Sequence, residues 1–353
     1  MTVSRSDLVT AGPGRLRNGE ASMVELGDGS LLLAWTRFFG GTHDRDASDI
    51  QAMTSADDGA SWSAPWCIVP STPRYKAGSP SLLVLPSGRI LCIAGLRYSD
   101  RRSHLVLLTS DDGGRSFQER GPICDDHRHL GCHNDRLILS SRSRLLLPLT
   151  WKEDAGLPEE AGEEDSRRFR SKGYAGCLWS DDHGQRWERS ASELTVERRG
   201  AAEPCIVELR DGRLLLTART QLGFIYSSTS RDHGSSFTPL EPTPLSSPEA
   251  PHTIKRSPRD GCLYLVRCPH FVPDVHHYGP RFPLLLSRSR DDGESWEDCI
   301  EIESSPAYEY SNCSMLFHGS RLLLTYYVRH MDRSREDFDR KDLRLAVVEM
   351  EGG

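Results

Sequence analysis

The sequence lacks a long hydrophobic run. No stretch approaches the ~20 apolar residues of a membrane-spanning helix, so we expect no membrane association. The first residues, Met1 to Asp7, lack the apolar segment of a secretion signal, and we expect a cytoplasmic protein. The net charge is -7, which leaves no excess of basic residues for a polyanion and argues against nucleic acid as a partner.

Motifs for metals and cofactors are also lacking. The ten cysteines include no CxxC pair and read as small buried residues in a reducing compartment. His127, His129 and His133 lie close together, but without partner ligands at the spacing of a zinc site. Neither a nucleotide-binding loop nor a haem motif occurs. We therefore expect no metal and no cofactor, and the sequence indicates no oligomeric state.

The chain does contain a repeated corner motif, Ser-x-Asp-x-Gly-x-x-(Trp or Phe). Gly adopts turn conformations that other residues resist, and the Ser and Asp side chains can bind nearby backbone N–H groups. The aromatic ring can pack beneath the turn. We interpret the motif as structural. Its five copies span residues 55–62, 110–117, 180–187, 230–237 and 289–296.

A second repeat alternates with the corners. It consists of two apolar strands joined by a turn that contains Gly or Ser, which is a hairpin pattern. Its six copies span residues 24–33, 83–93, 137–147, 207–216, 254–266 and 315–326. This period, with four short strands in each unit, predicts an all-β, six-bladed β-propeller that occupies residues 1–353 as one domain. Residues 2–10 can pair with the C-terminal strands and so close the last blade.

Polar segments lie between these repeats and are candidates for a site at one end of the propeller. They are residues 38–49, 127–136, 202–209, 247–252 and 307–312. The stretch from Trp151 to Lys172 mixes both charges and lengthens one repeat. We predict an exposed insertion there, with a lid as its functional interpretation.

With its corner motifs and scattered polar motifs, the chain resembles the sialidase (neuraminidase) superfamily of six-bladed propellers with Asp boxes, over nearly its whole length. That family binds the substrate carboxylate with three arginines. The resemblance places them at Arg17, in Arg17-Asn18-Gly19-Glu20, at Arg219, in Thr217-Ala218-Arg219-Thr220, and at Arg281. We call these three arginines the clamp. Arg15 remains an alternative for the first of them, and Arg136 is a candidate for an additional member.

The same resemblance implies the catalytic residues. Asp44 takes the place of the acid/base, Glu203 of the base, and Tyr310, in Tyr310-Ser311, of the nucleophile. Arginines suit a carboxylate because they form charge-assisted, bidentate hydrogen bonds. A neutral Tyr activated by Glu avoids repulsion from the substrate carboxylate, and sialidases are known for this nucleophile. The resemblance thus implies retaining cleavage of terminal sialic acid or a related carboxylated sugar.

Two features depart from the family pattern. The Arg-Ile-Pro context of the first arginine is absent, and the closing strand around Leu324 to Tyr327 lacks the Glu that braces this arginine. Two alternatives therefore stay open beside the sialidase-like glycosidase. One is a propeller hydrolase or lyase acting on another acidic glycan, and the other is a propeller that binds a glycan or a protein without catalysis.

Overall fold

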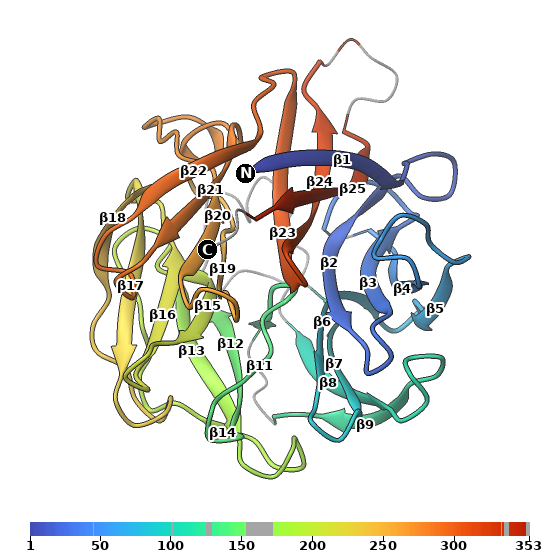
Figure 1. The fold of residues 1–353 in the computed structure, drawn as a ribbon, viewed down its shortest axis with the longest axis horizontal. Helices are drawn as coiled ribbons and strands as arrows, with labels where there is room; N and C mark the ends of the chain where they lie inside the picture. The colour runs from blue at the N-terminus through green and yellow to red at the C-terminus, as the bar shows by residue number, and fades with distance from the viewer. Residues whose placement is uncertain are drawn as a thin grey trace.

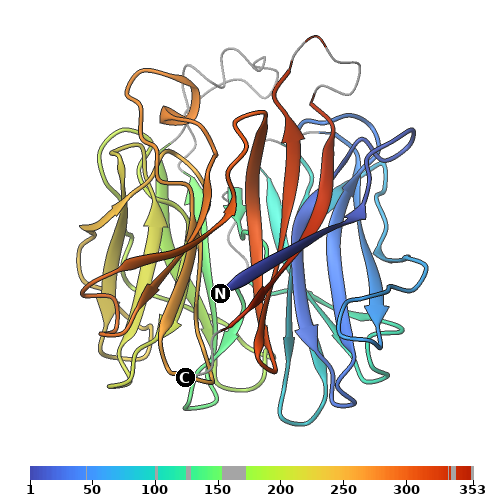
Figure 2. The same cartoon turned by 45° about the horizontal axis from the view of Figure 1, so that its top comes forward.

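The computed structural model describes residues 1–44, 46–99, 102–124, 129–152, 172–332, 334 and 339–350. Small antiparallel sheets stand around a central axis, the channel axis of a propeller, with their strands roughly parallel to it (Figures 1 and 2). The predicted insertion at Trp151 to Lys172 lies outside the described residues except at its two ends. No helix of the described part of the chain is long and apolar enough to cross a membrane.

Six blades follow one another along the chain, each with its first strand at the channel. Blade 1 is β2 (Arg17–Glu25), β3 (Leu31–Phe38), β4 (Ser48–Ser55) and β5 (Trp66–Val69). Blade 2 is β6 (Lys76–Val84), β7 (Ile90–Arg97), β8 (Ser103–Ser110) and β9 (Gln118–Pro122). Blade 3 is β10 (His129–Gly131), β11 (Ile138–Leu139), β12 (Leu145–Lys152), β13 (Gly173–Ser180) and β14 (Glu188–Arg189).

The second half of the ring repeats this order. Blade 4 is β15 (Ala202–Glu208), β16 (Leu214–Arg219), β17 (Phe224–Ser230) and β18 (Glu241–Ser246). Blade 5 is β19 (Thr253–Arg256), β20 (Leu263–Arg267), β21 (Leu284–Ser289) and β22 (Glu297–Glu303), with a short 3-10 helix, η1 (His276–Tyr278), before β21. Blade 6 is β23 (Tyr308–His318), β24 (Arg321–His330) and β25 (Lys341–Glu349), completed by β1 (Thr2–Val9).

The N-terminal strand closes the ring as the sequence predicts. β1 pairs antiparallel with β25, from Thr2 opposite Glu349 to Val9 opposite Leu343, and crosses the C-terminal strands in Figure 2. β2 and β25 also meet in one parallel pair, Arg17 opposite Lys341, which joins blades 1 and 6 into a continuous sheet. Both ends of the chain therefore hold the last blade in place.

The corner motifs connect the third and fourth strands of blades 1 to 5, and they are structural. In the first, Gly59 N–H donates to Ser55 Oγ (2.8 Å), Ser61 N–H donates to Asp57 Oδ1 (2.8 Å), and the Trp62 indole donates to the Gly59 carbonyl (3.1 Å). The motif glycine has a positive φ, 88° in Gly59, which favours glycine. The corner thus satisfies its own backbone donors.

The core lies between blades rather than within them. Buried apolar side chains of the described residues form six clusters, and each cluster draws on two consecutive blades. The motif glycines contribute to this packing, because a Cβ on Gly114 of blade 2 would lie 2.7 Å from a Leu32 methyl of blade 1. Close packing between blades fixes the ring, and the ring holds the inner strands around the channel.

Candidate active site

The inner strands carry a repeated bulge that turns polar side chains toward the channel. Strand register shifts occur between Gly19 and Ser22 and between Ala202 and Cys205, with similar shifts in β6 and β23. Near each shift a residue other than glycine has a positive φ, a costly conformation that clusters at functional sites. These residues are Glu20 (51°), Ser79 (52°), Glu203 (48°) and Asn312 (57°), and Asp135 (59°) lies where β10 and β11 are interrupted.

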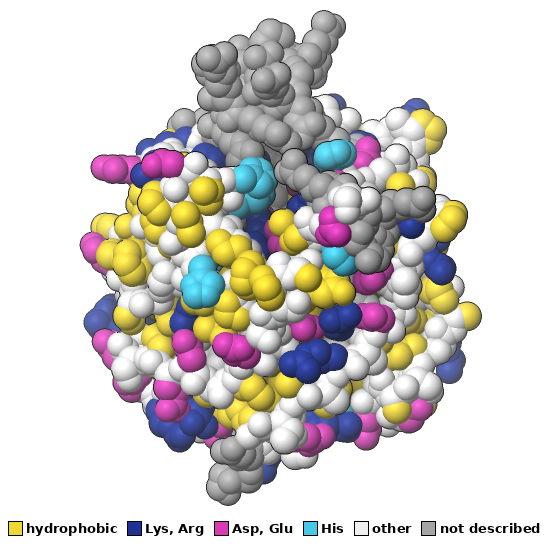
Figure 3. Space-filling view, turned by 90° about the horizontal axis from the view of Figure 1, so that it is seen from above, with side chains coloured by type: hydrophobic (Ala, Val, Ile, Leu, Met, Phe, Trp, Pro, Cys, Tyr) yellow, Lys and Arg dark blue, Asp and Glu magenta, His cyan; other side chains and the backbone are white. Residues whose placement is uncertain are grey.

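The middle of the channel is closed by this interruption of blade 3. Asp135 accepts hydrogen bonds from Ser22 Oγ (3.2 Å), the Lys255 ammonium (2.8 Å) and the Met315 N–H (2.9 Å). These partners belong to blades 1, 5 and 6. Asp135 therefore ties four blades together at the axis and forms the floor of the site. The site itself lies at the end of the channel where β2 begins, uppermost in Figure 2. Figure 3 looks onto this face, where basic side chains are visible within a hollow.

Arg17, at the start of β2, is buried in this site and held by two carboxylates. Its Nη2 donates to Glu20 Oε1 (2.8 Å), and its Nη1 donates to Asp44 Oδ1 (2.5 Å). The other oxygen of Glu20 accepts from Thr36 Oγ1 (3.1 Å) and Ser79 Oγ (3.0 Å). Glu20 thus supplies the brace for Arg17 that the closing strand lacks. The family pattern gives no signal for it, because Glu20 follows Arg17 by three residues and does not stand near Tyr327.

Asp44 lies beside Arg17, with a side chain that is 75% exposed. The Arg17 guanidinium holds the pKa of Asp44 well below its usual range. Asp44 is therefore a carboxylate. A general acid at this position needs a change in its surroundings before it can hold a proton.

Glu203 and Arg219 form an ion pair between β15 and β16, with 2.9 Å between Oε1 and Nη2. Burial alone would raise the pKa of Glu203, but the charges of Arg219 and Arg281 contribute to lowering it below its ordinary value. His133 Nδ1 faces Arg136 Nη2, which can only donate (3.2 Å), so the His133 proton lies on Nε2, 3.7 Å from Glu203 Oε2. Burial lowers the pKa of His133 to about 3, so the ring is neutral.

Arg281 contacts a tyrosine hydroxyl, and the tyrosine is Tyr327 of β24. Arg281 Nη1 donates to Tyr327 Oη (2.9 Å) and lies 3.4 Å from Ser311 Oγ, while Arg281 Nε lies 3.4 Å from Glu309 Oε1. Burial and the charge of Glu309 raise the pKa of Tyr327 to about 12. Arg17 and Arg281 both act on this phenol in the opposite direction. Tyr327 therefore stands between two of the three predicted clamp arginines.

The structure does not bring Tyr310, the nucleophile that the sequence predicts, to this cluster. Tyr310 is 0% exposed and belongs to the apolar cluster between blades 5 and 6. The charges that act on its hydroxyl include those of Glu303 and Arg344, on the outer strands β22 and β25. Side chains alternate between the faces of a strand, so Ser311, the next residue, faces the site instead. Ser311 is paired with Tyr327 in the register, and its small side chain leaves the room that the Tyr327 ring occupies.

Arg136 lies near the cluster but does not belong to the clamp. It is 2% exposed, and its terminal nitrogens donate to the carbonyls of Asn134 (2.9 Å) and His252 (2.8 Å), besides the contact with His133. These contacts engage both terminal nitrogens, so Arg136 helps to hold the floor together. Of the polar cluster at residues 127–136, residues 127 and 128 lie outside the described part of the chain.

Five of the predicted site residues do come together, Arg17, Asp44, Glu203, Arg219 and Arg281. Glu203 is acted on by both Arg219 and Arg281, and Tyr327 by both Arg281 and Arg17. The five residues and Tyr327 therefore form one continuous electrostatic group drawn from blades 1, 4, 5 and 6. No group of three or more His, Cys, Asp or Glu side chains in the described residues is arranged to hold a metal ion.

A family model described as the BNR repeat-like domain matches residues 29–322. The chain belongs to this family. No curated protein matches the chain. The BNR repeats are the corner motifs described above, which recur in five of the six blades.

Solved structures share this BNR-repeat fold. A protein of unknown function from Dyadobacter fermentans has a TM-score of 0.75 at 19% identity, and the match covers 99% of both chains. A Hadza microbial sialidase has a TM-score of 0.74 at 17% identity, over 95% of this chain and 66% of that one. A leech intramolecular trans-sialidase has a TM-score of 0.74 at 17% identity, over 99% of this chain and 70% of that one. These likenesses confirm the sialidase-like propeller fold.

Proposed function

We propose that the protein is a glycosidase that binds a terminal sugar through its carboxylate and cleaves the glycosidic bond with retention. The observation that carries this proposal is the contact between Arg281 and the Tyr327 hydroxyl, inside a group that also holds Arg17 and Arg219. Three arginines in one group with a phenol suit a sugar whose anomeric carbon bears a carboxylate. The sialidase-like fold of the neighbours supports the same reaction class.

In this proposal Tyr327 replaces Tyr310 as the nucleophile. Its raised pKa keeps the phenol neutral, so the substrate carboxylate does not repel it. Glu309, the carboxylate that acts most strongly on Tyr327, takes the phenol proton as Oη attacks the anomeric carbon. This role, assigned to Glu203 by sequence, passes to Glu309, while Glu203 holds Arg219 in place.

Asp44 supplies the proton for the leaving group. The bond from the anomeric carbon to the leaving oxygen breaks as Tyr327 attacks, and Asp44 protonates that oxygen. Binding of the substrate carboxylate to Arg17 weakens the Arg17–Asp44 pair and raises the pKa of Asp44 toward its ordinary value. Enclosure of Asp44 beside the bound anionic sugar raises its pKa further, so Asp44 takes up from solvent the proton that the leaving oxygen then receives. Asp44 then takes a proton from water, which displaces Tyr327 and completes retention.

A second candidate is binding of an acidic sugar without turnover. The burial of Tyr310 favours it, because the residue at the family's nucleophile position is absent from the site. The clamp serves both functions in the same way, so only product formation separates them.

The test is release of 4-methylumbelliferone from a sialoside and from a panel of uronosides, with Arg219→Lys as the diagnostic variant. Lys retains the charge but loses the planar fork, so kcat/KM should fall about thirty- to a thousandfold, or roughly 2 to 4 kcal/mol. Arg142→Lys, in an exposed turn of blade 3, is the control. Binding of these sugars without release of the fluorophore would favour the second candidate. Equal, small effects of the two variants would refute the clamp.

A further inference from the structure

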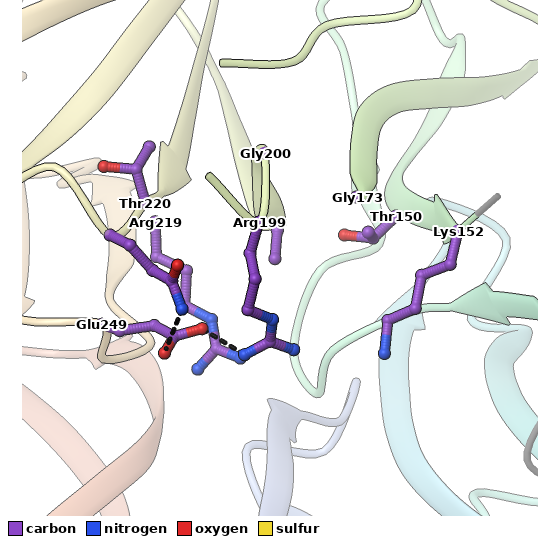
Figure 4. A pocket seen from close by; sticks show the side chains of 10 residues that line it. Thr150, Lys152, Gly173, Arg199, Gly200, Arg219, Thr220 and Glu249 are labelled. Carbon is purple, nitrogen blue, oxygen red and sulfur yellow. Dashed lines mark hydrogen bonds and ion pairs between the residues drawn. The ribbon is translucent and has the colours of Figure 1, made fainter. Parts of the chain in front are cut away.

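A pocket opens beside the clamp, between blades 3 and 4. Its walls include Thr150 and Lys152 of β12 and Arg199, Arg219 and Glu249. Figure 4 shows the cationic ends of Lys152, Arg199 and Arg219 at the same end of the pocket. Since Arg219 also belongs to the clamp, the pocket and the proposed sugar site share one wall.

The pocket has more positive than negative charge. Arg199 forms an ion pair with Glu249, whose other oxygen accepts from Gln221 Nε2 (3.0 Å) and lies 3.6 Å from His277 Nδ1. Arg219 is paired with Glu203. Both carboxylates near the pocket are therefore engaged by other groups.

Lys152 is the third cation of the pocket, and neither of these two carboxylates pairs with it. Its ammonium has neither a hydrogen bond nor an ion pair with any residue that the structure describes. Burial, and then Arg199, Arg97 and Arg219, lower the pKa of Lys152 to about 8. A cation buried among other cations is unfavourable unless an anion joins them. An anion in this pocket would therefore be stabilised by Lys152 and Arg199.

We propose that this pocket binds a second anionic group of the same ligand, a sulfate, phosphate or carboxylate, with Lys152 as its main contact. The ligand is then an acidic sugar that carries at least two negative charges. One charge lies in the clamp and the other lies between blades 3 and 4. The assignment of both charges to one ligand depends on the proposed function, whereas the anion site does not.

The first experiment titrates inorganic sulfate into the full-length protein by calorimetry. The variants are Lys152→Met, which keeps the apolar stem, and Lys152→Arg, which keeps the charge. Arg142→Met removes a charge from an exposed turn of the same blade and serves as the control. Loss of a charge-assisted contact should weaken sulfate binding at this site about ten- to a hundredfold. Lys152→Arg and Arg142→Met should bind as the unaltered protein does.

Proton uptake gives an independent readout. Because bound sulfate favours the charged ammonium, binding near pH 8 should take up a proton, and affinity should fall as the pH rises past the pKa of Lys152. Titrations in two buffers of different ionisation enthalpy measure this uptake. It should disappear in Lys152→Met, and uptake that persists there would place the titrating group elsewhere.

The second experiment compares sialic acid, whose anomeric carbon bears the carboxylate, with its sulfate ester. The ester should bind about tenfold more tightly than the parent sugar, and Lys152→Met should abolish the difference. If neither sugar binds but Lys152-dependent sulfate binding persists, the proposed function fails and the anion site stands. If the sugars are cleaved but Lys152→Met changes neither sulfate affinity nor the ester preference, the anion site alone is refuted. Melting temperatures show whether each variant folds, with Lys152→Gln replacing Lys152→Met if the latter does not.

Discussion

Two tyrosines that lie on neighbouring strands provide the sharpest test of the site. Tyr310→Phe and Tyr327→Phe each remove a single oxygen atom, so the pair is matched in chemistry. Tyr327 Oη accepts from Arg281 Nη1 at 2.9 Å and is the proposed nucleophile. Tyr310 Oη has no hydrogen-bond partner within the described residues and is enclosed by the cluster between blades 5 and 6. The two substitutions should therefore have opposite effects on turnover and on stability.

Tyr327→Phe should abolish turnover, because no other hydroxyl of comparable acidity contacts the arginines. The loss should exceed a factor of ~1,000, or about 4 kcal/mol of transition-state stabilisation. Stability should fall by roughly 1 kcal/mol, since one donor of buried Arg281 loses its acceptor. Tyr310→Phe should leave turnover unchanged and raise the free energy of unfolding by about 1 kcal/mol, because it removes a buried hydroxyl without a partner.

The assays are steady-state kinetics on the best substrate of the panel and urea-induced unfolding of both variants. Mass spectrometry of protein quenched during turnover can detect a glycosyl adduct, which should map to the peptide that contains Tyr327. An inactive Tyr310→Phe beside an active Tyr327→Phe would contradict the assignment. So would an adduct on Tyr310.

Three further predictions concern the brace, the blade contacts and the corner motifs. Glu20→Gln should lower kcat/KM about ten- to a hundredfold, because the amide loses the charge that positions Arg17 and presents donors to Thr36 and Ser79. Gly114→Ala should destabilise the protein by about 1 to 3 kcal/mol more than Gly88→Ala in urea unfolding. The two glycines share a φ near +84°, but only a Cβ on Gly114 would meet Leu32. The pKa values of Asp57 and Asp291 are lowered from 3.8 to about 2, first by their serine hydroxyls, so the stability they contribute is complete above pH 4 and is lost as the pH falls toward 2. Acid unfolding should be less steep below pH 4 when both are replaced by Asn, and unchanged steepness would show that the motifs are not linked to it.

The repeats predicted the fold correctly because they act locally. Each corner motif satisfies its own N–H groups, and each hairpin is set by a turn and two apolar strands, so neither depends on distant residues. Five corners and six hairpins therefore sufficed for six blades. The same number of hairpins predicted that β1 completes the last blade, because this blade needed one more strand.

The predicted site residues that gather in the structure lie near strand ends or in the loops that follow them, and Glu203 near the start of β15 is among them. Arg17, Asp44, Arg219 and Arg281 were placed by their position relative to a strand, and the ring brings those ends together. The sequence could not place the side chains of the bulged strands. A bulge adds one residue to the strand and reverses which side chains face the site, and it depends on pairing with the next strand.

This reversal decided which tyrosine faces the site. The sequence, through its resemblance to sialidases, predicted that a tyrosine, three arginines and carboxylates stand near one end of a six-bladed ring. Only the tertiary structure decided that Tyr310 packs between blades 5 and 6 while Tyr327, from the neighbouring strand, reaches Arg281. The physical reason is that the face a side chain takes is set by strand register and by the space left beside it, here by Ser311, and both depend on contacts between residues distant in sequence.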